Sequence, residues 1–96
     1  MPFQSPFPRS FTVPSIVEHA PKLPGVYGIS NAREWIYIGA ADSIQEALLR
    51  HLAESNTPVL DRRPTGFVFE VCDRGAHAGR QDRLVLEYEP TCNRRQ

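Results

Sequence analysis

The sequence predicts a small α+β domain in which a three-stranded antiparallel β-sheet is flanked by helices. Residues 25–29 and 35–39 are rich in β-branched and aromatic side chains and enclose a polar loop, which is typical of a β-hairpin. Residues 66–72 form a third β-prone segment, and residues 44–53 repeat apolar side chains at helical spacing. A chain of 96 residues is long enough for one such domain with one modest core.

The N-terminal part differs from the rest because it holds most of the proline. Six of the nine prolines lie at or before Pro24, and proline disfavours regular structure. We predict a proline-rich arm over residues 1–23, with a short helix near residues 14–20, followed by a folded domain over residues 24–96. Two roles are open for the aromatic residues of the arm, which either cover the domain's own core or dock on a partner. These residues are Phe3, Phe7 and Phe11.

The helix predicted over residues 44–53 begins with capping signals. Ser43 is a suitable N-cap, and Glu46 stands three residues later, as in a capping box. At about 100° per residue, one stripe of the helix is apolar and faces the core. The stripe consists of Ile44, Leu48 and Leu52. Ala47 and His51 lie together along one edge of it, at the junction between core and solvent.

The C-terminal half gives weaker signals. Residues 55–64 predict a polar connection in which Arg62 and Arg63 are the only concentrated charge. Residues 73–79 predict a turn with an exposed His77, since no carboxylate or cysteine is spaced to orient the imidazole. Residues 80–90 fit a strand and a helix equally well by pattern. In the helical interpretation Gln81 lies on the apolar face, where a polar group needs a partner.

Composition narrows the class of partner and the compartment. The formal net charge is zero, so any contact with nucleic acid must come from local patches rather than from a global positive field. Cys72 and Cys92 lack the CxxC spacing of metal and redox sites, and no apolar run is long enough for a signal peptide or a membrane span. We therefore expect a cytoplasmic protein with reduced thiols, no membrane partner and no cofactor.

Four short motifs, read in order, resemble those of the GIY-YIG nuclease superfamily. They are Pro24-Gly-Val-Tyr27, Tyr37-Ile-Gly39, Ser43-Ile44 opening the helix with His51, and Tyr88-Glu-Pro-Thr-Cys-Asn93. The resemblance runs over about residues 24–93 and implies a small antiparallel sheet flanked by helices. Active members of this family are metal-dependent phosphodiesterases that cut DNA.

The resemblance also implies roles for individual residues. Tyr27 is the candidate base or positioner of the attacking water, Tyr37 is a neighbouring phosphate-site residue, and His51 completes the catalytic positions. An unperturbed phenol has a pKa of about 10, so Tyr27 would need a nearby cation to act as a base at neutral pH. The remaining motif positions are structural, and they are Gly25, Gly39 and Asn93.

Two positions depart from the family pattern. The family supplies an arginine eight residues after the last glycine of the second motif and a glutamate nine residues before the terminal proline. Counted from Gly39 and Pro90, these positions are Ala47 and Gln81. A methyl group cannot bind phosphate as a guanidinium does, and a neutral amide is a weaker ligand for a divalent cation than a carboxylate. The pattern therefore favours a catalytically degenerate site.

Three functions follow as hypotheses. A domain without catalytic activity is favoured over an active enzyme. The chain is either a degenerate domain retained to bind DNA, an active endonuclease or a protein-interaction module without nucleic acid. The active form would use Mg²⁺ or Mn²⁺ and replace the missing groups with Arg50 and one of the carboxylates Asp82 and Glu87. Candidate nucleic-acid contacts are Arg33, Arg50, Arg62 and Arg63, with Arg94 and Arg95 at the end of the chain.

Overall fold

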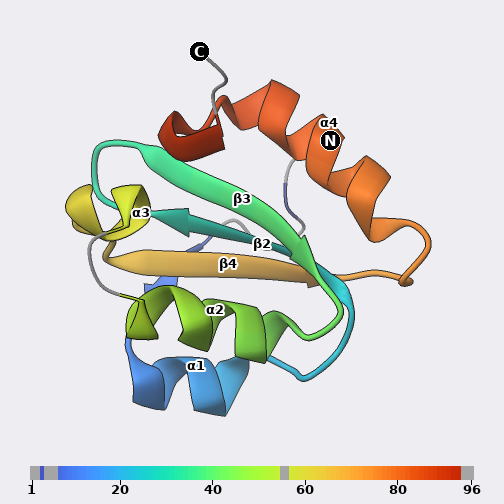
Figure 1. Ribbon diagram of the computed structural model, residues 1–96, viewed down its shortest axis with the longest axis horizontal. Helices are drawn as coiled ribbons and strands as arrows, with labels where there is room; N and C mark the ends of the chain where they lie inside the picture. The colour runs from blue at the N-terminus through green and yellow to red at the C-terminus, as the bar shows by residue number, and fades with distance from the viewer. Residues whose placement is uncertain (1–2, 4–6, 55–56, 94–96) are drawn as a thin grey trace.

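The computed structural model describes residue 3, residues 7–54 and residues 57–93, which form an antiparallel sheet with helices on both faces (Figure 1). The elements in chain order are β1 (Arg9–Ser10), α1 (Val13–His19), β2 (Gly25–Ser30), β3 (Trp35–Ala41), α2 (Ile44–Ala53), α3 (Pro58–Asp61), β4 (Gly66–Val71), α4 (His77–Tyr88) and the 3-10 helix η1 (Thr91–Asn93). The strand order is β1-β4-β2-β3, so β3 is an edge strand. The predicted α+β class is confirmed, but the sheet has four strands rather than three.

The additional strand comes from the proline-rich arm. Arg9 pairs with Phe67 and Ser10 pairs with Gly66, so β1 lies beside the start of β4. The backbone N–H of Phe11 extends this contact by donating to the carbonyl oxygen of Thr65 at 3.0 Å. A strand of two residues has no periodicity of its own, and its pairing partner lies far along the chain. For these reasons the sequence pattern did not predict it.

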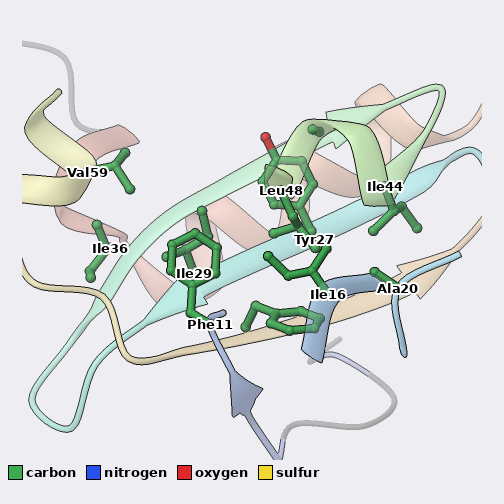
Figure 2. Packing of buried hydrophobic residues seen from close by; sticks show 11 residues of the cluster. Phe11, Ile16, Ala20, Tyr27, Ile29, Ile36, Ile44, Leu48 and Val59 are labelled. Carbon is green, nitrogen blue, oxygen red and sulfur yellow. The ribbon is translucent and has the colours of Figure 1, made fainter. Parts of the chain in front are cut away.

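Two hydrophobic clusters lie on opposite faces of the sheet, because successive side chains of a strand point to opposite sides. In β2, Val26 belongs to one cluster and Tyr27 to the other. The cluster that contains Tyr27 lies between the sheet and the helices α1 and α2, and Figure 2 shows it from close by. The second lies between the sheet and α4, where it includes Leu84. β2 is therefore buried along its whole length.

The arm contributes to both clusters. Phe3 is 2% exposed and packs beneath α4, whereas Phe11 is 6% exposed and packs with α1 on the other face. Phe7 is 84% exposed. Two of the three phenylalanines therefore cover the protein's own core, and Phe7 is left to contact solvent or a partner. The division into an arm of residues 1–23 and a domain of residues 24–96 stays a prediction, although the arm contributes buried side chains.

The helices follow local signals in the sequence. α2 has the predicted bounds, and the Ser43 hydroxyl accepts a hydrogen bond from the N–H of Glu46 at 3.3 Å. The ambiguous segment after residue 80 is helical and belongs to α4. The short helix α3 was not predicted, but Thr57 caps it through the N–H of Leu60 at 3.3 Å. Within the described residues, no helix is both long and apolar enough to cross a membrane.

Candidate functional site

Three aromatic side chains that are far apart in the sequence meet on the α2 face of the sheet. The hydroxyl of Tyr27 in β2 lies 2.8 Å from Nε2 of His51 in α2. The ring of Tyr37 in β3 lies beside both, with ring centroids 6.1 Å from Tyr27 and 5.2 Å from His51. The structure thus brings together all three predicted catalytic positions. We call Tyr27, Tyr37 and His51 the aromatic cluster.

An irregularity in β3 turns Tyr37 toward this cluster. Trp35 pairs with Ser30 and Tyr37 pairs with Ile29, so Ile36 has no partner of its own and forms a bulge. In a regular strand Trp35 and Tyr37 would share one face. Here Trp35 packs against the cluster beneath α4, and Tyr37 packs on the side of α2. The bulge therefore gives the second tyrosine its orientation.

Gly39 gives the two tyrosine rings the space they need. It pairs with Tyr27 across the sheet and follows Tyr37 by two residues on the same strand. A Cβ atom at this position would lie 2.5 Å from the Tyr27 hydroxyl oxygen and 2.8 Å from Cε2 of Tyr37. Gly25 has a comparable role, because a Cβ there would collide with the backbone carbonyl oxygen of Glu70. Both motif glycines are thus required by close packing.

Burial keeps two groups of the cluster, Tyr27 and His51, neutral at physiological pH. Burial raises the pKa of the Tyr27 phenol, the negative charge that Tyr37 would carry raises it further, and Arg50 opposes both effects. Burial also lowers the pKa of His51, with Glu54 opposing the shift and Arg50 adding to it. A protonated phenol and a neutral imidazole can each donate or accept a hydrogen bond, but neither carries a charge.

At the two positions that depart from the family pattern, Ala47 and Gln81, both side chains make contacts that hold the fold together. Ala47 is 9% exposed, and its methyl group belongs to the cluster beneath α2. Gln81 reaches β3 from α4, where its Nε2 donates to the carbonyl oxygen of Ile38 at 3.1 Å. This is the partner that an inward-facing glutamine was predicted to need. Neither side chain offers a charged group to the aromatic cluster.

Asn93 reinforces the contact that Gln81 makes. Its Oδ1 accepts from the N–H of Ile38 at 2.7 Å, and its Nδ2 donates to the carbonyl oxygen of Ile38 at 3.0 Å. Since β3 is an edge strand, these backbone groups would otherwise face solvent. Gln81 and Asn93 therefore close the edge of β3, and we call the pair the edge clamp.

The side chains at these positions do not suit a divalent cation. Mg²⁺ and Mn²⁺ prefer charged oxygen ligands, whereas Gln81 offers a neutral amide that already donates to Ile38. Among the residues that the structure describes, no three His, Cys, Asp or Glu side chains are grouped so that they could hold a metal ion. Asp82 and Glu87 are exposed on α4. The expectation that no cofactor is bound stays a prediction.

The four arginines predicted to contact nucleic acid fall into two groups. Arg50 is exposed on α2, and its charge influences both Tyr27 and His51. Arg33 lies in the β2–β3 loop, and it lines one cleft with Arg62 and Arg63, which follow α3. Arg94 and Arg95 lie outside the described residues.

One polar contact, between His77 and Asp42, was missed by the sequence interpretation, because it joins segments that are distant in the chain. Nε2 of His77 lies 3.3 Å from Oδ1 of Asp42, and the His77 side chain is only 18% exposed. The predicted exposed turn is therefore wrong at this position, since α4 begins at His77. Asp42 follows β3 and Arg74 precedes α4, and their side chains are also in contact at 3.2 Å. No local spacing in the sequence could indicate this arrangement.

Comparison with known proteins gives one relative in sequence and several in structure. No family model matches the chain. It is similar to the UvrABC system protein C of Hydrogenobaculum sp. (strain Y04AAS1), with 48% identity over 40 residues. These residues are 42% of this chain and 7% of that protein, so the chain spans only a small part of its curated relative.

Several solved structures that resemble the chain are forms of one protein domain, the GIY-YIG N-terminal endonuclease domain of UvrC from Thermotoga maritima. A tyrosine-to-phenylalanine mutant bound to its catalytic divalent cation matches with a TM-score of 0.73 and 24% identity, over 86% of this chain and 96% of that one. The magnesium-bound form matches with a TM-score of 0.72 and 24% identity, over 85% and 96%. These matches confirm the predicted fold class.

Proposed function

The chain has the fold of the GIY-YIG nuclease superfamily, and we propose that it is a degenerate member that binds DNA at the aromatic cluster without cutting it. The proposal has two parts, which are retained contact with phosphate and lost chemistry. Each part rests on different residues. The two parts can therefore be tested separately.

The spacing of the aromatic cluster supports retained contact with phosphate. The solved UvrC domains include three mutants in which a tyrosine is replaced by phenylalanine, and these tyrosines are separated by ten and by fourteen residues. Tyr27, Tyr37 and His51 are separated by the same numbers of residues. His51 then occupies the third of these positions, where an imidazole can replace a phenol as a hydrogen-bonding group. Arg50 adds a positive charge beside it.

The hydrogen bond between Gln81 and Ile38 is the observation that carries the proposal of lost chemistry. A carboxylate accepts hydrogen bonds only, so a glutamate at this position could not make the contact that Gln81 makes with the carbonyl oxygen of Ile38. The Gln81 amide therefore serves to bond the open edge of β3. With a methyl group at Ala47, the site also lacks an arginine facing the phosphate.

The electrostatics of Tyr27 agree with this proposal. A general base works best when its pKa lies near the working pH, and the pKa of this phenol is shifted upward, away from neutrality. The hydroxyl also has a hydrogen-bonding partner in His51. Tyr27 is therefore suited to hold His51 in place and to donate a hydrogen bond, and it is poorly suited to remove a proton from water.

The test compares binding and cutting on the same DNA. We expect the wild-type chain to bind a short duplex at low salt, with affinity falling steeply as salt is added, and to leave supercoiled plasmid intact in Mg²⁺ or Mn²⁺. The double variant Ala47→Arg with Gln81→Glu should bind and also nick the plasmid. Ala53→Arg with Gln81→Glu is the control, since Ala53 is exposed on the same helix and adds an equal charge elsewhere.

Two results would contradict the proposal. Nicking by the wild type that disappears in Tyr27→Phe would show an active enzyme. Absence of DNA binding at low salt would instead favour the third hypothesis, a module that binds protein. The exposed ring of Phe7 would then be the first candidate contact, and a pull-down with Phe7→Ala would test it.

The active endonuclease remains a second candidate because of one observation. Arg50 is close enough to lower the pKa of both Tyr27 and His51, so its guanidinium could face a phosphate bound at the aromatic cluster. If this candidate is correct, Arg50→Ala abolishes nicking while Arg83→Ala on the exposed side of α4 leaves it unchanged.

A further inference from the structure

Two loops that are distant in the sequence are fastened together at one end of the sheet, and Asn31 makes the connection. Its Nδ2 donates to the carbonyl oxygen of Arg62 at 2.8 Å, which joins the β2–β3 loop to the residues after α3. Figure 1 shows this loop and α3 side by side. The connection gives the two loops a fixed relative position.

Asn31 also fixes the shape of its own loop. Its Oδ1 accepts from the N–H of Arg33 at 2.8 Å and from the N–H of Glu34 at 2.9 Å. One side chain therefore makes three hydrogen bonds to the backbone of both loops. Because Arg33 and Arg62 are held through the same amide, their separation depends on Asn31.

A cleft of about 450 Å³ lies between the two loops. It is lined by three arginines, Arg33, Arg62 and Arg63, and by the polar side chain of Asn31. The backbone of Arg63 has a φ of 55°, which turns the chain toward β4 and is unusual for a residue with a side chain. We call this hollow the arginine cleft.

Two carboxylates, Glu34 and Asp61, also line the arginine cleft, and Glu34 already contacts other side chains. Oε1 of Glu34 accepts from the Thr91 hydroxyl at 2.6 Å, and Oε2 lies 3.7 Å from the Arg62 guanidinium. Asp61 is exposed. The cleft therefore keeps a positive balance of three arginines against two carboxylates, and Arg33 and Arg63 supply the charge that is not shared with Glu34.

We propose that the arginine cleft is a second phosphate-binding subsite, which holds the DNA backbone beside the aromatic cluster. This inference rests on the proposed function, because it assumes that DNA is the ligand. Planar guanidinium groups from two sides of a polar cleft suit phosphate oxygens, which accept hydrogen bonds from paired donors. The positive balance of the cleft favours anions over cations, and its polar lining disfavours apolar ligands.

The path of β3 connects the two subsites. Tyr37 follows Arg33 by four residues, and extended backbone rises about 3.3 Å per residue, so their backbones lie at most roughly 13 Å apart. One strand of duplex DNA carries a phosphate about every 3.4 Å along its axis. A duplex seated on the aromatic cluster can therefore present a second phosphate of the same molecule to the arginine cleft.

The salt dependence of DNA binding tests this subsite. We expect the double variant Arg33→Ala with Arg63→Ala to bind a short duplex more weakly and to lower the slope of log affinity against log salt by about 2. Lys22→Ala with Arg83→Ala is the matched control, because it removes two exposed charges from other surfaces. Equal losses in both double variants would overturn the inference, since they would show a general effect of charge.

Arg50→Ala separates failure of the inference from failure of the proposed function. Loss of affinity in Arg50→Ala alone overturns the arginine cleft and leaves the aromatic cluster as the binding site. Loss in the cleft variant alone supports the cleft and overturns the proposed site. If the wild type binds no DNA, both are overturned, and binding of inorganic phosphate alone would identify the cleft as a site for a free anion and not for a polymer.

Asn31→Ala provides a test that leaves every charge in place. It removes all three hydrogen bonds that fix the two loops, so we expect weaker DNA binding with a melting temperature that still shows a folded chain. Asp61→Asn should have the opposite effect and strengthen binding, because it removes a negative charge from the cleft. Unchanged affinity in both variants would overturn the inference.

Discussion

The aromatic cluster and the edge clamp both involve strand β3, through Tyr37 and Ile38, and they use their polar atoms differently. The aromatic cluster keeps groups that can meet a ligand, since Tyr37 and His51 are only partly buried. In the edge clamp, by contrast, Gln81 and Asn93 use their polar atoms on the backbone of Ile38. The first region leaves two side chains partly exposed, and the polar atoms of the second are bonded to the backbone of β3.

Under the proposed function, this difference explains how the chemistry would be lost while the architecture stays in place. A charged side chain buried in a nuclease site lowers the stability of the fold unless it has a partner or a ligand. Replacing a carboxylate by an amide removes that requirement and adds a donor. The aromatic residues carry no such cost, and they also fill the core in which Tyr27 packs beside Leu48 (Figure 2).

The largest effect is expected from Gly39→Ala, which would break the aromatic cluster. The added Cβ would lie 2.5 Å from the hydroxyl oxygen and 2.6 Å from Cζ of Tyr27, and these atoms belong to a rigid ring. We expect the free energy of unfolding to fall by about 3 kcal/mol, as for an overpacked core. Denaturant unfolding measures this directly.

Gly75→Ala is the matched control for that variant. It makes the same substitution in the loop before α4, where an added Cβ meets no atom within 4 Å. Its effect should remain within about 0.5 kcal/mol, as for most surface changes. If both glycine variants lose the same stability, close packing is not the reason for Gly39.

Gln81→Glu would open the edge clamp, and we expect a loss of about 2 kcal/mol at neutral pH. The carboxylate cannot donate to the carbonyl oxygen of Ile38 and would face it as a second acceptor. Protonation restores a donor, so the difference from wild type should shrink as the pH falls toward about 4. Urea titrations at neutral and acidic pH test this, and a gap that does not depend on pH would contradict the assigned hydrogen bond.

Tyr27→Phe should cost about 1 kcal/mol, because it removes the hydrogen bond to His51 and leaves the ring in place. Tyr37→Phe is the control. In the described part of the chain the Tyr37 hydroxyl forms no hydrogen bond, so its loss should change stability by less than half as much. Thermal unfolding of both variants makes the comparison, and equal losses would show that the Tyr27–His51 contact adds little.

The sequence predicted the local parts of this fold and missed the parts made by long-range pairing. α2 has the predicted bounds because its cap and its apolar stripe are encoded within a few residues. β1 is absent from the predicted sheet because a pair of residues gains strand geometry only from its partner, Phe67 and Gly66. The contact of His77 with Asp42 was missed for the same reason.

In the candidate site, too, the sequence predicted which residues take part but not the contacts that orient them. The motifs placed Tyr27, Tyr37 and His51 in one site, because their spacing is set by β2, β3 and α2. They could not show that a bulge at Ile36 turns Tyr37 toward α2, because the bulge depends on how β3 pairs with β2. An inward-facing Gln81 was predicted to need a partner, but Ile38 could be identified only from the structure.

The smallest effect concerns the pH dependence that His51 adds to stability. Burial lowers its pKa in the folded state, whereas an unfolded histidine titrates near about 6.5. Below that value the unfolded chain binds a proton more readily than the folded chain does, so stability is complete above about pH 6.5 and declines as the pH falls toward the folded pKa.

His51→Gln isolates this contribution, since the amide keeps a hydrogen-bonding group near Tyr27 and does not titrate. We expect the wild type to lose more stability than His51→Gln between pH 7.5 and pH 5.5, by less than about 1 kcal/mol, because the half-buried ring is partly screened by solvent. Subtracting the two denaturation curves removes the contributions of His19 and His77. A difference of the opposite sign would mean that the folded state favours charged His51, and the aromatic cluster would then carry a positive charge suited to phosphate.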